Sequence, residues 1–451
     1  MDAADLDRQA RTSSGCIPPP LVSRLLELGY EKEVEFQAGR GDWFCAREWT
    51  RLLGARGRQA EALEVLAPYV ATGWWPAARA QAELLEGWGR AEEAIALVGS
   101  YAKVGGPALE FYARLLARHD RQDEAIVRLS AGIEDWLLAT ALVEVAEGAG
   151  RDEEIAALLA ARIPAGHRCE GPWCCRGLDP DTAIGLLAAI RERQGRVDEA
   201  IALLHTRHIT SVNNHDQLAD LLARHDRIEE LRAYAASEHH GHAARRLAEL
   251  LERRGEVEAA IAVYREPGDS AADPCRAAVE LAQLLARQGR GEEAIEVMRT
   301  LADAQGAGQD WIVDMLCTLY ADQGRARDAL AYLDSRGARR DGGDEWDLFR
   351  VRLRLMAGCG LLDEAIGQAR LHPEGDGPYV AWTISELLAE AGRTEEAVAV
   401  LEPHAPVNRD ALGGHLIELG RVKEALALLR QRESEPFVPV WSGTFSDEHP
   451  R

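Results

Sequence analysis

The segment from His167 to Cys175 holds the densest group of side chains that could bind a metal ion. It reads His-Arg-Cys-Glu-Gly-Pro-Trp-Cys-Cys, and its soft donors are His167, Cys169, Cys174 and Cys175. Imidazole and thiolate groups are the usual ligands of tetrahedral Zn²⁺, and the Gly-Pro turn could fold the four donors together. The spacing fits no standard zinc knuckle, so two alternatives stay open. One is a redox pair such as Cys169 with Cys174, and the other, which we favour, is an ordinary loop between repeats.

Motifs for catalysis are missing from the rest of the sequence. It contains no glycine-rich phosphate loop ending in Lys-Ser/Thr, no His-Glu-x-x-His and no Gly-x-Ser-x-Gly elbow. Catalytic groups can also assemble from distant helices, so an enzyme with a dispersed site is kept as the weakest alternative. We expect a protein that is not an enzyme and has no cofactor, unless the cysteine cluster binds zinc.

Composition limits the partners that the chain can have. The 451 residues carry a formal net charge of −23, which would repel a nucleic-acid backbone or an anionic membrane unless basic residues were gathered on one face. Residues 1–20 lack the apolar segment of a secretory signal, and no run of about 18 apolar residues indicates a membrane span. The eight cysteines follow no disulfide framework. We therefore expect a cytoplasmic protein that binds neither nucleic acid nor membrane.

One short pattern organises most of the chain and must position any site. Residues 284–295 read Leu-Leu-Ala-Arg-Gln-Gly-Arg-Gly-Glu-Glu-Ala-Ile, which is typical of a helix end, a tight turn and a new helix. Gly289 can adopt the left-handed conformation that closes a helix without a Cβ clash. Glu292 and Glu293 then fall in the first turn of the next helix, where negative charge suits the helix dipole.

The same turn recurs along the whole chain. Residues 115–121 and 221–227 are identical heptads, Leu-Leu-Ala-Arg-His-Asp-Arg, which indicates internal duplication. Successive turns are 28 to 36 residues apart, except for one interval of 45 between Gly150 and Gly195 that indicates an insertion at about 164–180. The predicted turn residues are Gly29, Gly57, Gly89, Asp120, Gly150, Gly195, Asp226, Gly255, Gly289, Gly324, Gly360, Gly392 and Gly420.

Small residues recur on both sides of each turn, and they predict where paired helices cross closely. The small residues at the fifth position after a turn are Ala62, Ala94, Ala125, Ala200, Ala260, Ala294, Ala329, Ala365, Ala397 and Ala425. The small residues at the seventh position before a turn are Ala82, Ala113, Ala188, Ala219, Ala248, Ala282, Cys317, Ser385 and Gly413.

The repeated pattern resembles the tetratricopeptide repeat family over about residues 21–430. A typical unit combines a small residue, a glycine, an acidic pair and Ala-Ile, and the period is near 34 residues. The resemblance implies an all-α fold: an α-solenoid of about 12–13 antiparallel helical hairpins in a right-handed superhelix. Residues 1–20 are expected to be a polar leader, the unit that turns at Gly29 a cap on the array, and residues 431–451 a tail. The apolar centre of that tail, residues 436–441, could cap the last hairpin or occupy a groove of its own or another copy.

An arginine follows the turn in ten of the twelve turns from Gly57 onward, beginning with Arg58 and ending with Arg421. Such a row could bind an anionic ligand. The interpretation we favour is structural: each arginine bonds carbonyls at the preceding helix end or a neighbouring acid.

The family resemblance also implies that a concave face, lined by each unit's first helix, binds a peptide or protein. Helix geometry places positions ten and six before each turn on that face, and exposed Trp, Tyr and Arg supply most binding hot spots. The candidate partner-binding residues are Arg47, Arg51, Arg79, Glu83, Arg114, Asp216, Asp220, Arg245, Trp311, Arg350, Arg354, Tyr379 and Trp382.

Three functions remain after this reading. The leading hypothesis is a cytoplasmic scaffold or regulatory adaptor that binds a protein or peptide on the concave face. The second is a ligand- or metal-responsive sensor that uses His167 to Cys175, and the third is the dispersed-site enzyme. The oligomeric state is open, and self-association through the array ends or the tail is one possibility.

Overall fold

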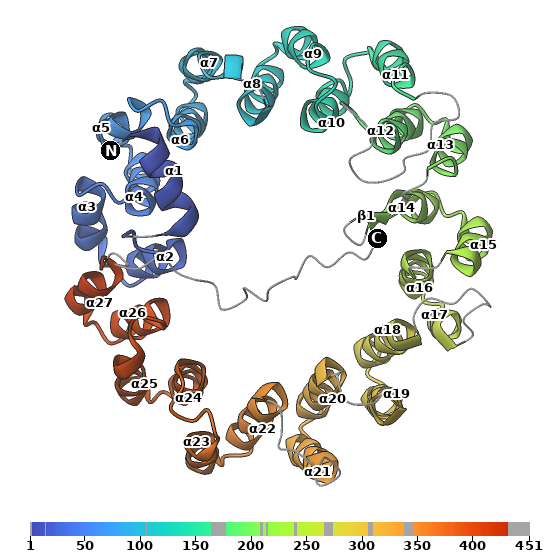
Figure 1. Cartoon of the computed structure of the whole chain (residues 1–451). Helices are drawn as coiled ribbons and strands as arrows, with labels where there is room; N and C mark the ends of the chain where they lie inside the picture. The colour runs from blue at the N-terminus through green and yellow to red at the C-terminus, as the bar shows by residue number, and fades with distance from the viewer. Residues whose placement is uncertain are drawn as a thin grey trace, which may run out of the picture. The chain divides into compact units, whose positions relative to one another are not determined.

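The computed structural model describes residues 2–13, 15–104, 106–163, 177–207, 211–212, 215–238, 241–265, 274–304, 310–337 and 346–431. Over these residues the chain is all-α apart from one two-residue strand pair, β1 (Ser211–Val212) with β2 (His215–Asp216), which is antiparallel. Described helices that follow one another in the chain pair antiparallel, as α18 (Pro274–Arg287) does with α19 (Gly291–Ala304) (Figure 1). The predicted all-α array of helical hairpins is confirmed.

The chain divides into two compact units: unit 1 is residues 1–98 and 366–451, and unit 2 is residues 99–365. Unit 1 contains α1 (Ala3–Thr12), α2 (Pro19–Glu27), α3 (Glu31–Gly39), α4 (Trp43–Ala55), α5 (Gln59–Val70), α6 (Trp75–Gly87), α7 (Ala91–Gly99), most of α23 (Leu362–Leu371), α24 (Pro378–Glu390), α25 (Thr394–Leu401), η2 (Glu402–His404), α26 (Arg409–Glu418) and α27 (Val422–Leu429). Unit 2 contains η1 (Ala102–Val104), α8 (Gly106–Arg118), α9 (Gln122–Ser130), α10 (Trp136–Val145), α11 (Asp152–Ala160), α12 (Pro180–Arg193), α13 (Val197–Leu204), α14 (Gln217–Arg224), α15 (Ile228–Ser237), α16 (His242–Arg253), α17 (Val257–Arg265), α18 (Pro274–Arg287), α19 (Gly291–Ala304), α20 (Asp310–Asp322), α21 (Ala326–Gly337) and α22 (Trp346–Gly358).

The thirteen predicted turn residues all have a positive φ, so each hairpin bends where the sequence indicates. Gly289 has φ +73°, and the amide of Arg290 donates to the carbonyl of Leu285 at 2.9 Å, which closes the last turn of α18. Asp120 and Asp226 both have φ +61° and occupy the same position, because aspartate is among the few side chains that tolerate the left-handed region. The hairpins are therefore specified locally.

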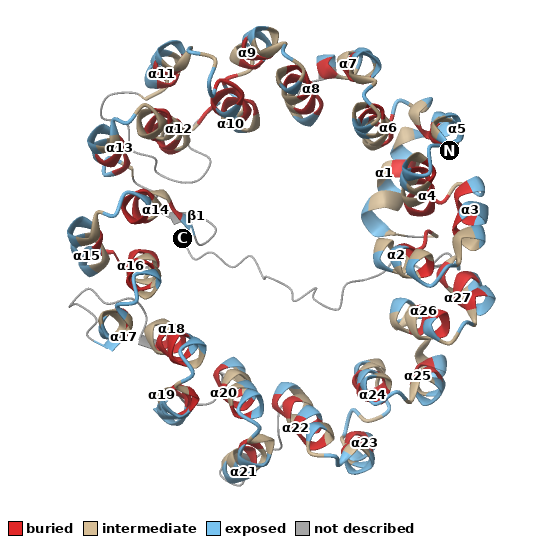
Figure 2. Ribbon diagram, turned by 180° about the vertical axis from the view of Figure 1, so that it is seen from behind, coloured by how far each residue is buried: buried red, intermediate tan, exposed pale blue. Residues whose placement is uncertain are grey.

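The small residues that flank the turns are buried where helices cross. All ten alanines predicted five residues after the turn are fully buried, and so are most of their predicted partners, such as Ala282 and Ser385. Figure 2 shows buried positions on the sides where neighbouring helices meet. Close crossing of the helix axes therefore depends on these positions, as predicted.

Within unit 2, the hairpins from α12 to α22 share one continuous apolar core that runs from Ala188 to Leu355. Each hairpin buries its apolar face on its neighbours, as expected of a repeat array. Within this unit the first helices, α8 to α22 by even numbers, line the inner side of an arc and the second helices lie outside it (Figure 1). The layer that the resemblance assigns to partner binding is thus present in unit 2.

Unit 1 joins hairpins from both ends of the sequence. Its core includes Leu25 and Val34 of the first hairpin together with Leu416 and Leu429 of the last hairpin. Contacts between α2 and α26 hold the two hairpins together. The expectation that the first hairpin simply caps the array is therefore wrong, because its apolar face is covered by the last hairpin.

Residues of the expected polar leader form α1. Asp2 caps this helix by accepting a hydrogen bond from the Asp5 amide at 2.9 Å, and Leu6 is fully buried in the core of unit 1. The helix contacts α4. Leu6, together with the partly buried Ala3 and Ala10, anchors this otherwise polar helix on the core of unit 1.

Candidate functional site

The arginines that follow the turns form a structural row, called here the arginine ladder. Arg290, for example, pairs with Glu293 at 2.6 Å and with Glu258 of the preceding repeat at 2.7 Å. The hydrogen bond from Arg290 lowers the pKa of Glu293. The ladder pairs are Arg58–Glu61, Arg90–Glu93, Arg121–Glu124, Arg151–Glu154, Arg196–Glu199, Arg227–Glu230, Arg290–Glu293, Arg325–Asp328, Arg393–Glu396 and Arg421–Glu424. The structural interpretation, in which each arginine bonds a neighbouring acid, is confirmed.

In unit 1 the predicted partner-binding charges of the first helices each have a partner of opposite charge on the same helix. Arg47 and Arg51 of α4 both contact Glu48, at 3.0 and 3.2 Å. Arg79 of α6 contacts Glu83 at 2.8 Å. These side chains are largely exposed, but each has a carboxylate or guanidinium partner on its own helix.

In unit 2 the predicted charges also have partners, often on a neighbouring helix. The partner acids lie on the same helix or on an adjacent hairpin, so most of these side chains link elements of the array. The contacts are Arg114 with Glu110 and with Glu144 at 2.5 Å, Asp220 with Arg246, Arg245 with Glu249 at 3.9 Å, and Arg354 with Asp314 at 3.1 Å.

Arg350, the remaining predicted charge, is half-buried on α22. The described part of the chain places no carboxylate within salt-bridge distance of it.

Asp216 was predicted to face a partner, and this prediction is wrong. Its side chain is only 2% exposed because it caps α14, accepting from the amides of Leu218 at 2.9 Å and Ala219 at 3.1 Å. The Tyr234 hydroxyl also donates to it at 2.6 Å. Burial raises its pKa even though these three donors oppose the shift.

The three predicted aromatic residues are placed differently from one another. Trp311, near the start of α20 in unit 2, is 50% exposed, and Tyr379, near the start of α24 in unit 1, is 63% exposed. Trp382 is only half-buried, and it packs against the core of unit 1. Part of the Trp382 side chain is therefore used for packing, and only the rest could contact a partner.

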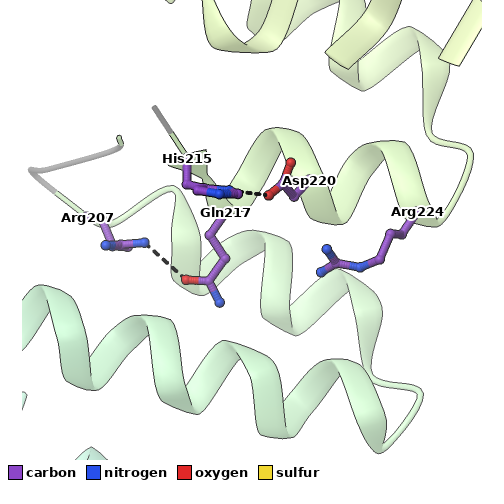
Figure 3. Close-up of a pocket in the computed structure, with 5 residues that line it drawn as sticks. All are labelled: Arg207, His215, Gln217, Asp220 and Arg224. Carbon is purple, nitrogen blue, oxygen red and sulfur yellow. Dashed lines mark hydrogen bonds and ion pairs between the residues drawn. The ribbon is translucent and has the colours of Figure 1, made fainter. Parts of the chain in front are cut away.

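A polar pocket of about 300 Å³ lies at the start of α14 in unit 2 (Figure 3). His215 Nδ1 lies 3.6 Å from Asp220, and Arg207 donates to Gln217 at 3.1 Å. Arg224 is bound by Glu192 at 2.8 Å. The described charged groups of this pocket are thus mostly satisfied by one another.

A larger groove, of about 690 Å³, lies between α3 and α27 in unit 1. The two helices lie side by side in both views (Figures 1 and 2), where the first and last hairpins meet. We call it the α3–α27 groove. Its lining residues are Lys32, Glu33, Phe36, Gln37, Arg40, Lys423, Leu426, Ala427 and Arg430.

Helix periodicity explains how α3 builds one wall of the groove. Lys32, Phe36 and Arg40 are four residues apart and share a face. Phe36 is 60% exposed, and the guanidinium of Arg40 lies 5.7 Å from its ring centroid. An apolar ring is thus held in solvent beside a cation.

The α27 wall carries Lys423, Ala427 and Arg430 on one face. Arg430 donates to the buried Gln37 and interacts electrostatically with the buried Asp42. Lys32, Arg40 and Lys423 differ from the ladder arginines, since no carboxylate among the described residues lies within salt-bridge distance of them. The groove therefore presents uncompensated positive charge, with Glu33 as its one acidic lining residue.

Contacts between the chain ends hold the groove in place. Arg24 of α2 makes a two-point contact with Glu418 of α26, at 2.5 and 2.8 Å. These residues are 394 positions apart in sequence, and Arg430 and Gln37 are 393 apart. Two of the chain's three lysines line this groove, which was the only sequence signal that could have drawn attention to it.

The proposed zinc donors His167, Cys169, Cys174 and Cys175 lie outside the described residues. Within the part of the chain that the structure describes, no three His, Cys, Asp or Glu side chains gather where they could hold a metal ion. No described helix combines the length and the apolar character needed to cross a bilayer.

Comparisons with known proteins give little for this chain. No protein-family model matches it, and no curated protein does. Among solved structures, the structure of Naa15/Naa10 bound to HypK-THB contains a chain that is 16% identical to this one, with a TM-score of 0.39. The match covers 91% of this chain and 74% of that chain. A likeness this distant indicates no function for the chain.

Proposed function

We propose that this chain is a protein-interaction scaffold that binds an acidic, aromatic-containing segment of a protein partner in the α3–α27 groove. One observation carries the proposal: Lys32, Arg40 and Lys423 line the same groove as the exposed Phe36, and no carboxylate of the described residues pairs with them. This arrangement stands out in a chain whose net charge is −23. The proposal assigns no reaction to the protein.

The chemistry of the groove defines the ligand. Carboxylates of the partner would meet the ammonium and guanidinium groups of the rim, and such charge complementarity mainly sets specificity and association rate. An aromatic or aliphatic side chain would cover Phe36, Leu426 and Ala427, and aromatic side chains are enriched among the few residues that dominate binding energy. The volume of about 690 Å³ suits a short peptide segment rather than a whole domain.

The concave face remains a second proposed contact surface for the same partner. Most of its predicted charges are already paired, which lowers the gain from binding a new charge there. Trp311 and Tyr379 are the exposed side chains on that list that could still add apolar contacts. Each belongs to a different unit, so each has to be tested separately.

A peptide array tests the proposal. It would display nonapeptides with two acidic residues and one or two aromatic residues, beside versions with Gln for Glu and Ala for the aromatics. We expect the full chain to retain acidic–aromatic peptides and to release both altered versions. The double variant Lys32→Glu/Lys423→Glu should lose the binding.

Lys103→Glu provides the matched control, because Lys103 is an exposed lysine of η1 in unit 2 and lies outside the groove. Equal loss of binding in the control and in the double variant would show that net charge alone matters. Retention of the peptides by the double variant would refute the groove as the binding site.

A further inference from the structure

Arg430 lines the groove, and the chain continues soon after it with a sequence whose charge and polarity suit the groove. Residues 433–441 read Glu-Ser-Glu-Pro-Phe-Val-Pro-Val-Trp, two acids followed by an apolar stretch with two aromatics. We propose that residues 433–441 bind in the α3–α27 groove of the same molecule, as a resident ligand that a partner's segment must displace. This inference rests on the proposed function of the groove.

Charge and polarity match on the two sides. Glu433 and Glu435 supply carboxylates to a groove whose cations Lys32, Arg40 and Lys423 have none among the described residues. Phe437, Val438 and Trp441 supply apolar surface, and the groove offers Phe36, Leu426 and Ala427. Ala427 is exposed as well as Phe36, so the apolar part of the groove is open to a ligand. The same chain thus carries the acidic and aromatic features that the groove requires.

Residues 433–441 are also long enough to span the α3–α27 groove, and they follow closely after Arg430, which lines it. Helices α3 and α27 have nine and eight residues, so each spans about 12–14 Å at 1.5 Å per residue. Nine extended residues reach about 30 Å, which allows the chain to turn back after Arg430 and follow the groove to Lys423. Pro436 and Pro439 restrict the backbone of the segment, which reduces the entropy lost on binding.

Covalent attachment favours this ligand over one in solution. A short tether gives its two ends an effective concentration of the order of millimolar. Even if the segment binds weakly, it would therefore occupy the groove in the free protein. An incoming peptide would have to compete with it. We expect the resident segment to weaken binding of a free acidic–aromatic peptide at least about fivefold.

Photo-crosslinking in the full chain tests the contact directly. A p-benzoylphenylalanine would replace Trp441, and cross-linked peptides would be identified by mass spectrometry in the monomer fraction. We expect cross-links to residues 31–40 or 422–430, fewer of them in Lys32→Glu/Lys423→Glu and an unchanged number in Lys103→Glu. Cross-links between chains only, cross-links to other surfaces, or no cross-links would overturn the proposal.

Competition separates this inference from the proposed function. The full-length variant Phe437→Ala/Trp441→Ala should bind the best array peptide at least about fivefold more tightly than the native chain. Phe445→Ala is the matched control, since it removes an aromatic residue outside the segment. If array peptides bind with equal affinity to both chains, the resident ligand is refuted and the groove's function stands. If the cross-link forms but the variant binds no array peptide, the proposed function fails and the intramolecular contact stands.

Discussion

The arginine ladder and the α3–α27 groove are two cationic regions of one acidic protein, and they treat charge in opposite ways. In the ladder each arginine has an acid three residues later, and several reach a second acid of the preceding repeat. In the groove Lys32, Arg40 and Lys423 have no such partner among the described residues. A paired cation fixes the turn between two helices, whereas an unpaired cation beside an exposed ring is available to a ligand. The partners of a basic residue, more than its presence, therefore indicate its role.

Reversing the groove charges should have the largest effect. Lys32→Glu/Lys423→Glu should weaken binding of an acidic–aromatic peptide by roughly 30-fold, from two losses of about 1 kcal/mol each. Fluorescence polarisation with a labelled array peptide would measure it, and Lys103→Glu should stay within about twofold. A similar loss in both variants would erase the distinction between groove and general surface charge.

Removing the exposed ring should have the next largest effect. Phe36→Ala should weaken the same peptide about fivefold, since it removes about 1 kcal/mol of apolar contact. The melting temperature should stay the same, because the ring is 60% exposed in the free protein. A clear fall in melting temperature with unchanged affinity would make Phe36 a packing residue instead.

Substituting a ladder arginine should affect stability slightly and leave peptide affinity unchanged. Arg290→Met should lower the melting temperature by no more than about 2 °C, because exposed ion pairs contribute little in a chain of this size. Peptide affinity should not change, since Arg290 lies in unit 2 and the groove lies in unit 1. Loss of peptide binding in this variant would show that the ladder also recognises ligands.

The smallest expected effect is a pH dependence of the stability of the Arg24–Glu418 contact, which joins α2 to α26 beside the groove. The hydrogen bond from Arg24 lowers the pKa of Glu418. A carboxyl whose pKa is lowered in the folded state adds stability above its ordinary value, about 4.3, and that stability is lost as the pH falls through the lowered value. The protection factors of the α2 and α26 amides, which remove the pH dependence of intrinsic exchange, should therefore fall in the native chain as the pH drops through this range.

Arg24→Met is the control for this junction. It should already exchange faster at neutral pH and respond less to acid, because the pair that titrates is missing. An identical acid response in the variant and in the native chain would assign the effect to other carboxyls.

The hairpins could be predicted from sequence because their signals are local. Gly289 and Asp120 both take the conformation that their turn requires, and Ala294 is buried where its spacing indicates. Asp216 was misplaced because α14 has only eight residues, so a position counted back from Asp226 falls on the cap before the helix. Counting along a helix face fails once the helix has ended.

The groove could not be predicted in this way. Its walls lie at opposite ends of the sequence and meet because the first and last hairpins share one core, as Arg24 and Glu418 show. No local pattern announces a contact between residues 394 positions apart. Once the two walls are together, the role of the lysines follows from what surrounds them.

Swapping charges on both the protein and the peptide shows whether the groove cations select the ligand. Isothermal titration would compare the native chain and Lys32→Glu/Lys423→Glu with one acidic–aromatic peptide and its twin in which lysines replace the acids. We expect the native chain to prefer the acidic peptide and the double variant the basic one, with the aromatic residue needed in both cases. If both proteins preferred the acidic peptide, the groove cations would play no part in choosing the ligand.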